Sequence, residues 1–91
     1  MSQAISSTVK IQNRLGLHAR PAMAFVDVAS TYESQITVKK GDQSVDGKSI
    51  MQMMMLAASK GTQLEVTAQG EQAEKACKAL KALVDGGFEE E

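Results

Sequence analysis

The sequence predicts an α+β fold, in which one mostly antiparallel sheet of four strands carries its helices on one face. The hydrophobic pattern switches between periods of two and about 3.6, in the order strand, helix, strand, strand, helix, strand, helix. The chain has 91 residues, which suffices for one domain with a single core over residues 1–91. Four short strands cannot bury both faces of their own sheet. Helices should therefore cover one face, with water on the other.

The first half of the chain predicts a strand, a helix and a hairpin. A half-buried strand is expected over about 4–12, where these residues alternate with mostly polar ones: Ile5, Ser7, Val9 and Ile11. The helix expected over 19–32 has apolar residues at the helical spacing of i, i+3, i+4 and i+7: Ala22, Phe25, Val26 and Ala29. Strands over 35–40 and 44–46 follow, joined by a turn at 41–43.

The second half predicts a helix, a strand and a helix, over about 49–58, 62–69 and 71–85. Ser49 suits an N-cap, because its hydroxyl can accept a backbone N–H of the first turn. Lys60–Gly61 is expected to end the first of these helices, and Gly86–Gly87 the second. The last helix should bury Ala73, Ala76, Cys77, Leu80, Leu83 and Val84. Residues 89–91 are expected to form a frayed acidic tail.

Composition narrows the classes of function. A net charge of −1 and only three aromatic residues argue against a nucleic-acid partner. No apolar run is long enough to span a membrane, and the N-terminus lacks the basic and apolar regions of a signal peptide. We therefore expect no membrane insertion and a cytoplasmic location. The single cysteine excludes an intramolecular disulfide, and one histidine far from one cysteine does not suggest zinc. No metal and no cofactor are expected.

The only histidine and the only proline lie three residues apart, at His18 and Pro21. Proline is favoured in the first turn of a helix, so His18 should lie at or just before the N-cap. A helix N-terminus offers unpaired backbone N–H groups and the positive end of the helix dipole, which suits an anion. The N–H groups of Ala19 and Arg20 could contact phosphoryl oxygens. His18 thus looks like a nucleophile beside a receptor for a phosphoryl group.

The segment Leu15–Ala22 resembles the active-site signature of the HPr family. These are the histidine-containing phosphocarrier proteins of the phosphoenolpyruvate-dependent phosphotransferase system. Gly47–Met51 resembles the regulatory-serine segment that begins the family's second helix, and the spacing of the two segments also matches. The similarity covers about residues 4–87. It implies an open-faced β-sandwich, with a four-stranded sheet in the order 1-4-2-3 covered by three helices.

The resemblance also implies roles. Enzyme I would pass a phosphoryl group from phosphoenolpyruvate to ring nitrogen Nδ1 of His18, with Arg20 as the active-site arginine. The chain would then pass the group to an EIIA protein, so it would be a stoichiometric carrier rather than an enzyme. Ser49 would be the residue modified by HPr kinase/phosphorylase. A monomer is expected.

Two features leave a second reading open. Gln52 stands where the family often has glycine, so the second helix is expected to be altered. The ending Gly87–Glu89 is similar to that of the nitrogen-branch relatives, which regulate and need not import sugar. Gly47–Ser49 instead favours the sugar branch or a general carrier. The alternative to a sugar carrier is therefore a regulatory binding module.

The run Ile50–Ala58 is apolar on nearly every side. We expect these residues to cover the sheet: Met53, Leu56 and Ala57. Three others should then lie near the surface beside His18: Ile50, Met51 and Met54. Methionine side chains adapt to several partners because they are flexible and polarizable. A carrier must dock at least two proteins, so we hypothesise that these three residues form a docking patch.

Simpler interpretations apply to several of these residues. A histidine near a helix start is often a surface residue, and the simpler interpretation of Ser49 is a cap for its helix. Cys77 is expected to contribute to packing. Three lysines are interpreted as solvated charges: Lys39, Lys40 and Lys48. Gly47–Ser49 lacks the upstream glycine of a phosphate-binding P-loop, and no motif marks a hydrolytic triad around His18.

Overall fold

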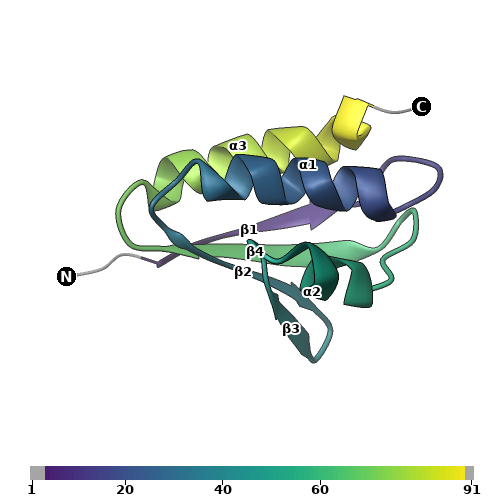
Figure 1. The fold of residues 1–91 in the computed structure, drawn as a ribbon, viewed down its shortest axis with the longest axis horizontal. Helices are drawn as coiled ribbons and strands as arrows, with labels where there is room; N and C mark the ends of the chain where they lie inside the picture. The colour runs from purple at the N-terminus through teal and green to yellow at the C-terminus, as the bar shows by residue number, and fades with distance from the viewer. Residues whose placement is uncertain (1–3, 90–91) are drawn as a thin grey trace.

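In the computed structural model, which describes residues 4–89, a four-stranded sheet is covered by helices (Figure 1). The strands are β1 (Ala4–Lys10), β2 (Gln35–Lys40), β3 (Gln43–Asp46) and β4 (Gln63–Gln69). The helices are α1 (Ala19–Ser30), α2 (Ile50–Met55) and α3 (Ala73–Asp85), followed by the short 3₁₀ turn η1 (Gly87–Glu89). The element order predicted from the sequence is confirmed.

The sheet has the order β1-β4-β2-β3, and every neighbouring pair is antiparallel. Val66 on β4 pairs with Ser7 on one side and with Val38 on the other. Val38 in turn pairs with Val45 on β3. Because side chains alternate along a strand, this register directs the valines of the three strands toward the helices. The open-faced antiparallel fold is therefore confirmed.

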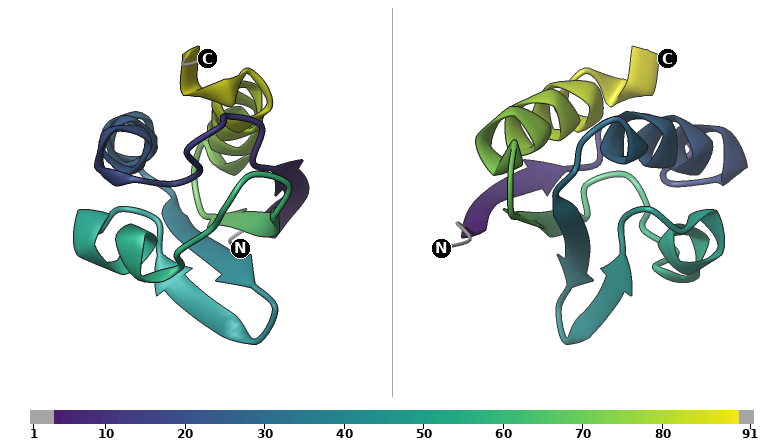
Figure 2. Two further views of the ribbon diagram at one scale, coloured as in Figure 1. Left: turned by 90° about the vertical axis from the view of Figure 1, so that its right-hand side faces the viewer. Right: turned by 60° about the vertical axis from the view of Figure 1, so that its left-hand side comes forward.

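The core lies between the sheet and the helices. α1 and α3 lie side by side across the sheet, and α2 covers its other end near β3 (Figure 2). Every residue predicted for the inner face of α1 is buried, with Phe25 fully enclosed. On α3 the prediction holds except at Leu83, which is only half-buried against the cluster. Within residues 4–89, no helix is both long and apolar enough to cross a membrane.

The second helix is shorter than predicted. α2 ends at Met55, and Ala57 then adopts a left-handed conformation with a φ of 49° that no helix can continue. This change of direction leaves Ala57 exposed and buries Ala58 instead, so the prediction for Ala57 is wrong. Gly61, predicted to end the helix, lies in the turn before β4 and donates its N–H to the Ile11 carbonyl at 2.8 Å.

Two of the three lysines interpreted as solvated charges make structural hydrogen bonds. Lys40 Nζ donates to the Leu56 carbonyl at 2.8 Å, and so binds a carbonyl just beyond the last turn of α2. Lys48 Nζ donates to the Tyr32 carbonyl at 2.8 Å, which joins the start of α2 to the end of α1. Lys39 is exposed, as expected. Cations are favoured where a helix ends, because the terminal carbonyls have no partner within the helix.

The chain continues past α3 in the 3₁₀ turn up to Glu89, so the first residue of the expected acidic tail is not frayed. Gly86 caps the helix, and Gly87 and Phe88 both adopt positive φ angles in the 3₁₀ turn. Phe88 is only 7% exposed and belongs to the core cluster. The sequence gives no signal for this anchor, because Phe88 follows two glycines and fits no helical period. Residues 90 and 91 of the expected acidic tail lie outside the described residues.

Phe88→Ala is expected to lower the free energy of unfolding by about 3 kcal/mol, since truncating a buried phenylalanine leaves a cavity. Urea denaturation followed by circular dichroism measures this loss. The matched control is Glu89→Ala, which changes an exposed neighbour in the same turn and should stay within about 0.5 kcal/mol of the original chain. Equal stability of the two variants would contradict an anchoring role for Phe88.

Candidate functional site

His18 is the N-cap of α1, as the sequence predicts. Its backbone is extended, with φ −83° and ψ −170°, and its carbonyl accepts the Ala22 N–H at 3.0 Å. This is the first hydrogen bond of the helix, so the N–H groups of Ala19 and Arg20 precede it. The His18 side chain makes no capping hydrogen bond to the helix. Pro21 is buried in the first turn.

The electrostatics at the start of α1 suit an anion. Arg20 is exposed in the first turn, and that turn contains no acidic residue. His18 is half-buried beside it in the chain. A guanidinium and the positive end of the helix dipole lie at the same terminus, and both favour a negatively charged group there. The structure therefore brings a nucleophilic side chain and an anion-favouring terminus together.

The loop before His18 rests against the segment after α2. Leu17 donates its N–H to the Ala58 carbonyl at 2.8 Å. Gly16 has a φ of 72°, and a Cβ added there would lie 2.5 Å from the Ala58 carbonyl oxygen and 2.9 Å from the Ser59 Cα. Only glycine fits such a close approach of two backbone segments. The loop that carries His18 is therefore held against the segment that follows α2.

Ser49 is the N-cap of α2, and it is half-buried. Its Oγ accepts the Gln52 N–H at 3.2 Å. Gln52 Oε1 reaches back to accept the Asp46 N–H at 2.9 Å. This resembles a capping box, in which a residue three positions after the cap reaches back past the helix start. The pattern Ser-x-x-Gln was readable in the sequence, and it gives Gln52 a structural role at the position where the family often has glycine.

The three residues of the hypothesised docking patch are exposed at the surface: Ile50 by 38%, Met51 by 79% and Met54 by 43%. The structure adds further large apolar side chains that the sequence analysis missed, at Leu15, Met23 and Met55. Met23 could have been found, because it lies outside the apolar spacing of α1. Leu15 lies in the loop before His18. A contiguous apolar patch marks an interaction surface, whereas apolar residues that are exposed singly are ordinary.

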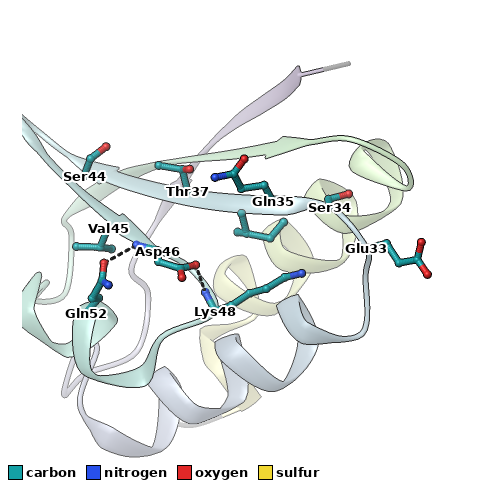
Figure 3. A pocket seen from close by; sticks show the side chains of 10 residues that line it. Glu33, Ser34, Gln35, Thr37, Ser44, Val45, Asp46, Lys48 and Gln52 are labelled. Atoms are coloured by element: carbon teal, nitrogen blue, oxygen red, sulfur yellow. Dashed lines mark hydrogen bonds between the residues drawn. The ribbon is translucent and has the colours of Figure 1, made fainter. Parts of the chain in front are cut away.

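A separate hollow of about 580 Å³ lies between the ends of β2 and β3 and the start of α2 (Figure 3). Its lining is mostly polar and carries both signs of charge, with Glu33, Asp46 and Lys48 at its wall. Dashed lines in Figure 3 mark the hydrogen bonds that hold Asp46 to Gln52 and to Lys48. His18 does not line this hollow, which therefore plays no part in the arrangement at the start of α1.

Cys77 is buried on the inner face of α3, as expected for a packing residue. Its Sγ donates to the Ile5 carbonyl at 3.2 Å. Burial raises the pKa of the Cys77 thiol above its ordinary value, so the thiol remains in its unreactive protonated form at neutral pH. Among residues 4–89, no three histidine, cysteine or acidic side chains gather in a group that could hold a metal ion.

Comparisons with known proteins agree with this geometry. Residues 5–85 match the family model of the PTS HPr component phosphorylation site. The chain is 51% identical to the phosphocarrier protein HPr of Pseudomonas aeruginosa, over 90% of this chain and 92% of that protein. It is 35% identical to the phosphocarrier protein NPr of Klebsiella oxytoca, over 96% and 98% of the two chains.

A solved structure shows the same fold. The crystal structure of HPr-C-His from Thermoanaerobacter tengcongensis is 45% identical and covers 96% of this chain and 98% of that one. The TM-score of the two structures is 0.91. The fold, the family model and the sequence identity of the relatives lead to one assignment. The chain belongs to the HPr family of phosphocarrier proteins of the phosphotransferase system.

Proposed function

We propose that this protein accepts a phosphoryl group on His18 from phosphorylated Enzyme I and passes it to an EIIA protein of the sugar phosphotransferase system. The observation that carries the proposal is the position of His18 as N-cap of α1, with Arg20 in the first turn. The protein is changed and restored in each cycle, so it acts as a stoichiometric carrier. Membership of the HPr family supports this role, and we place the carrier in the cytoplasm, where phosphoenolpyruvate is made.

In the phosphoryl transfer, the protein supplies the nucleophile and stabilises the charge on the phosphoryl group. A lone pair of the neutral imidazole forms a bond to phosphorus while the bond between phosphorus and the donor breaks, and the donor keeps that electron pair. A neutral imidazole nitrogen is a good nucleophile and forms covalent intermediates in enzymes. Phosphoryl transfer depends mainly on positioning and charge stabilisation. The N–H groups of Ala19 and Arg20 and the Arg20 guanidinium supply that stabilisation.

The direct test is incubation with Enzyme I and phosphoenolpyruvate, followed by mass spectrometry of the intact protein. The proposal expects one added phosphoryl group per chain. Digestion should place it on the peptide containing His18, and the Ser49→Ala variant should gain the same mass. A phosphoryl group on any other residue, or none, would contradict the proposal.

Arg20→Met is expected to slow acceptance of the phosphoryl group about 10- to 100-fold, because a hydrogen bond to a charged group contributes about 1.5–3 kcal/mol. Rapid-quench measurement of label transfer from Enzyme I gives this rate. Arg14→Met is the matched control, since Arg14 is an exposed arginine of the same loop region and its loss changes the net charge equally. If both variants were slowed equally, the effect of Arg20→Met would come from the change in net charge and not from a specific role of Arg20.

We further propose that Ile50, Met51 and Met54 form the surface that docks Enzyme I and the EIIA protein. Met51→Asp should raise the apparent KM for transfer about tenfold, because a carboxylate must lose water in an apolar contact. Its free energy of unfolding should change by less than about 0.5 kcal/mol, since Met51 is 79% exposed. Met51→Leu keeps the surface apolar and should transfer normally. An unchanged KM in Met51→Asp would exclude Met51 from the docking surface.

The second candidate function is a regulatory binding module, either a nitrogen-branch protein or one controlled through Ser49 by HPr kinase/phosphorylase. The 35% identity to the NPr of Klebsiella oxytoca supports the regulatory module as a second candidate. Competition separates the two branches: phosphorylated protein is offered to EIIA proteins of the sugar branch and of the nitrogen branch. A sugar carrier transfers its phosphoryl group faster to the EIIA protein of the sugar branch. Faster transfer to the EIIA protein of the nitrogen branch favours the regulatory function.

A further inference from the structure

Asn13 is buried in the loop between β1 and α1. It is 2% exposed, and among residues 4–89 it and Ser34 are the two buried polar residues. Asn13 Nδ2 donates to the Gly16 carbonyl at 2.6 Å. The Asn13 carbonyl accepts the Gly16 N–H at 3.2 Å. Backbone and side chain of one residue therefore hold Gly16 from both sides.

The Gly16 carbonyl is also the acceptor for the His18 backbone. His18 donates its N–H to this oxygen at 3.0 Å, so one carbonyl joins the Asn13 amide to the His18 main chain. A carbonyl oxygen has two lone pairs, which these two donors can occupy. The direction of the Gly16 carbonyl thus determines the position of the His18 backbone at the N-cap of α1.

The surroundings prevent this carbonyl from turning freely. On one side Gly16 lies against the Ala58 carbonyl, at a distance that admits no Cβ. On the other side the C-terminal turn approaches Asn13, since a Cβ at Gly87 would lie 3.9 Å from the Asn13 Cβ. Burial also makes loss of the hydrogen bond between Asn13 Nδ2 and the Gly16 carbonyl costly, because a buried N–H group without an acceptor cannot bind water instead. Gly16 is thus held against the segment after α2, and Asn13 against the C-terminal turn.

From these contacts we propose that Asn13 is a positioning residue for phosphoryl transfer, acting through the Gly16 carbonyl on the backbone of His18. This inference rests on the proposed function of His18. Asn13 touches no reacting atom in this account. It keeps the His18 backbone in the extended N-cap conformation from which the imidazole meets phosphorus beside the N–H groups of α1. Small errors in such alignment cost large factors in rate.

Two variants separate the hydrogen bond from packing. Asn13→Asp keeps the shape of the side chain and replaces the donor by a carboxylate, which cannot donate to the Gly16 carbonyl when ionised. Asn13→Ala removes the group without adding charge, and serves if the aspartate variant does not fold. The matched control is Ser34→Ala, because Ser34 Oγ donates to the Glu71 carbonyl. Ser34 follows the far end of α1, a helix about 18 Å long by its 12 residues.

Two readouts test the proposal. In rapid-quench experiments with phosphorylated Enzyme I, both Asn13 variants should lose roughly tenfold in the maximal transfer rate, with KM changed less than twofold. In NMR spectra, the His18 amide proton should shift and exchange faster with solvent. Ser34→Ala should transfer at the original rate and leave the His18 amide unchanged. An original transfer rate in a folded Asn13 variant, or equal loss in Ser34→Ala, overturns the proposal.

The NMR arm distinguishes this proposal from the function on which it rests. If the unaltered chain gains no phosphoryl group at His18, the proposed function fails. The His18 amide shift would still show whether Asn13 controls the backbone at the N-cap. If the unaltered chain is phosphorylated and the amide does not respond to either Asn13 variant, the positioning role alone fails.

Discussion

Gly16→Ala is expected to lower the free energy of unfolding by about 2–5 kcal/mol and to impair phosphorylation of His18. The left-handed φ of 72° costs an alanine about 1–2 kcal/mol. Its Cβ would also meet the Ala58 carbonyl oxygen at 2.5 Å, and moving two backbone segments apart costs about 1–3 kcal/mol more. The loop carries His18 two residues later, so its displacement moves the nucleophile.

The matched control for this substitution is Gly41→Ala. Gly41 also has a positive φ, of 57°, but a Cβ there would meet nothing within 4 Å. It lies in the hairpin between β2 and β3, away from the start of α1 (Figure 1). We expect a loss of only about 1–2 kcal/mol in chemical denaturation, with normal phosphorylation. If Gly16→Ala were as stable and as active as Gly41→Ala, the close contact with Ala58 would have no consequence for the site.

Ser49→Asp is expected to weaken transfer by about 10- to 100-fold while the fold keeps its stability. Aspartate caps a helix about as well as serine, so α2 should remain intact. The added charge lies next to the exposed side chains of Ile50 and Met51, where an apolar or acidic partner surface would have to approach it. Phosphorylation of Ser49 would add about −1.5 to −2 charges at the same place, with a larger effect.

Thermal denaturation and transfer kinetics, measured on the same samples, test the Ser49 substitution. Ser49→Ala is its control, because it loses the cap to Gln52 without adding charge. That variant should lose about 1 kcal/mol of stability and transfer normally. A Ser49→Asp protein that unfolds early, or that accepts the phosphoryl group at the original rate, contradicts a regulatory role for this position.

Much of the architecture followed from local patterns in the sequence. The period of the apolar residues predicted β1, β2, β4, α1 and α3, and turn and cap residues predicted β3 and α2. Pro21 located the start of α1 to within a residue. Local rules worked here because the inner faces of α1 and β2 follow their periods without interruption. His18 and Ser49 were found for the same reason, since each lies at a helix start marked by residues next to it.

Other features depend on contacts between distant segments. The end of α2 could not be predicted, because the residues that follow Met55 are good helix formers. The helix ends because Ala57 adopts a left-handed conformation. The lysine hydrogen bonds to Leu56 and Tyr32 each join residues 16 positions apart. Asn13 gave no signal, because its role depends on its hydrogen bond to Gly16 and on the approach of the distant Gly87.

The central claim is that His18 holds a phosphoryl group only in transit, and a two-step label experiment tests it most directly. The protein is first labelled with radioactive phosphoenolpyruvate and Enzyme I, then separated and mixed with EIIA protein. We expect a label that is labile in acid, stable in alkali and absent in His18→Ala, and that is transferred to the EIIA protein. No label, a label that survives in His18→Ala, or a label that never leaves would contradict the claim.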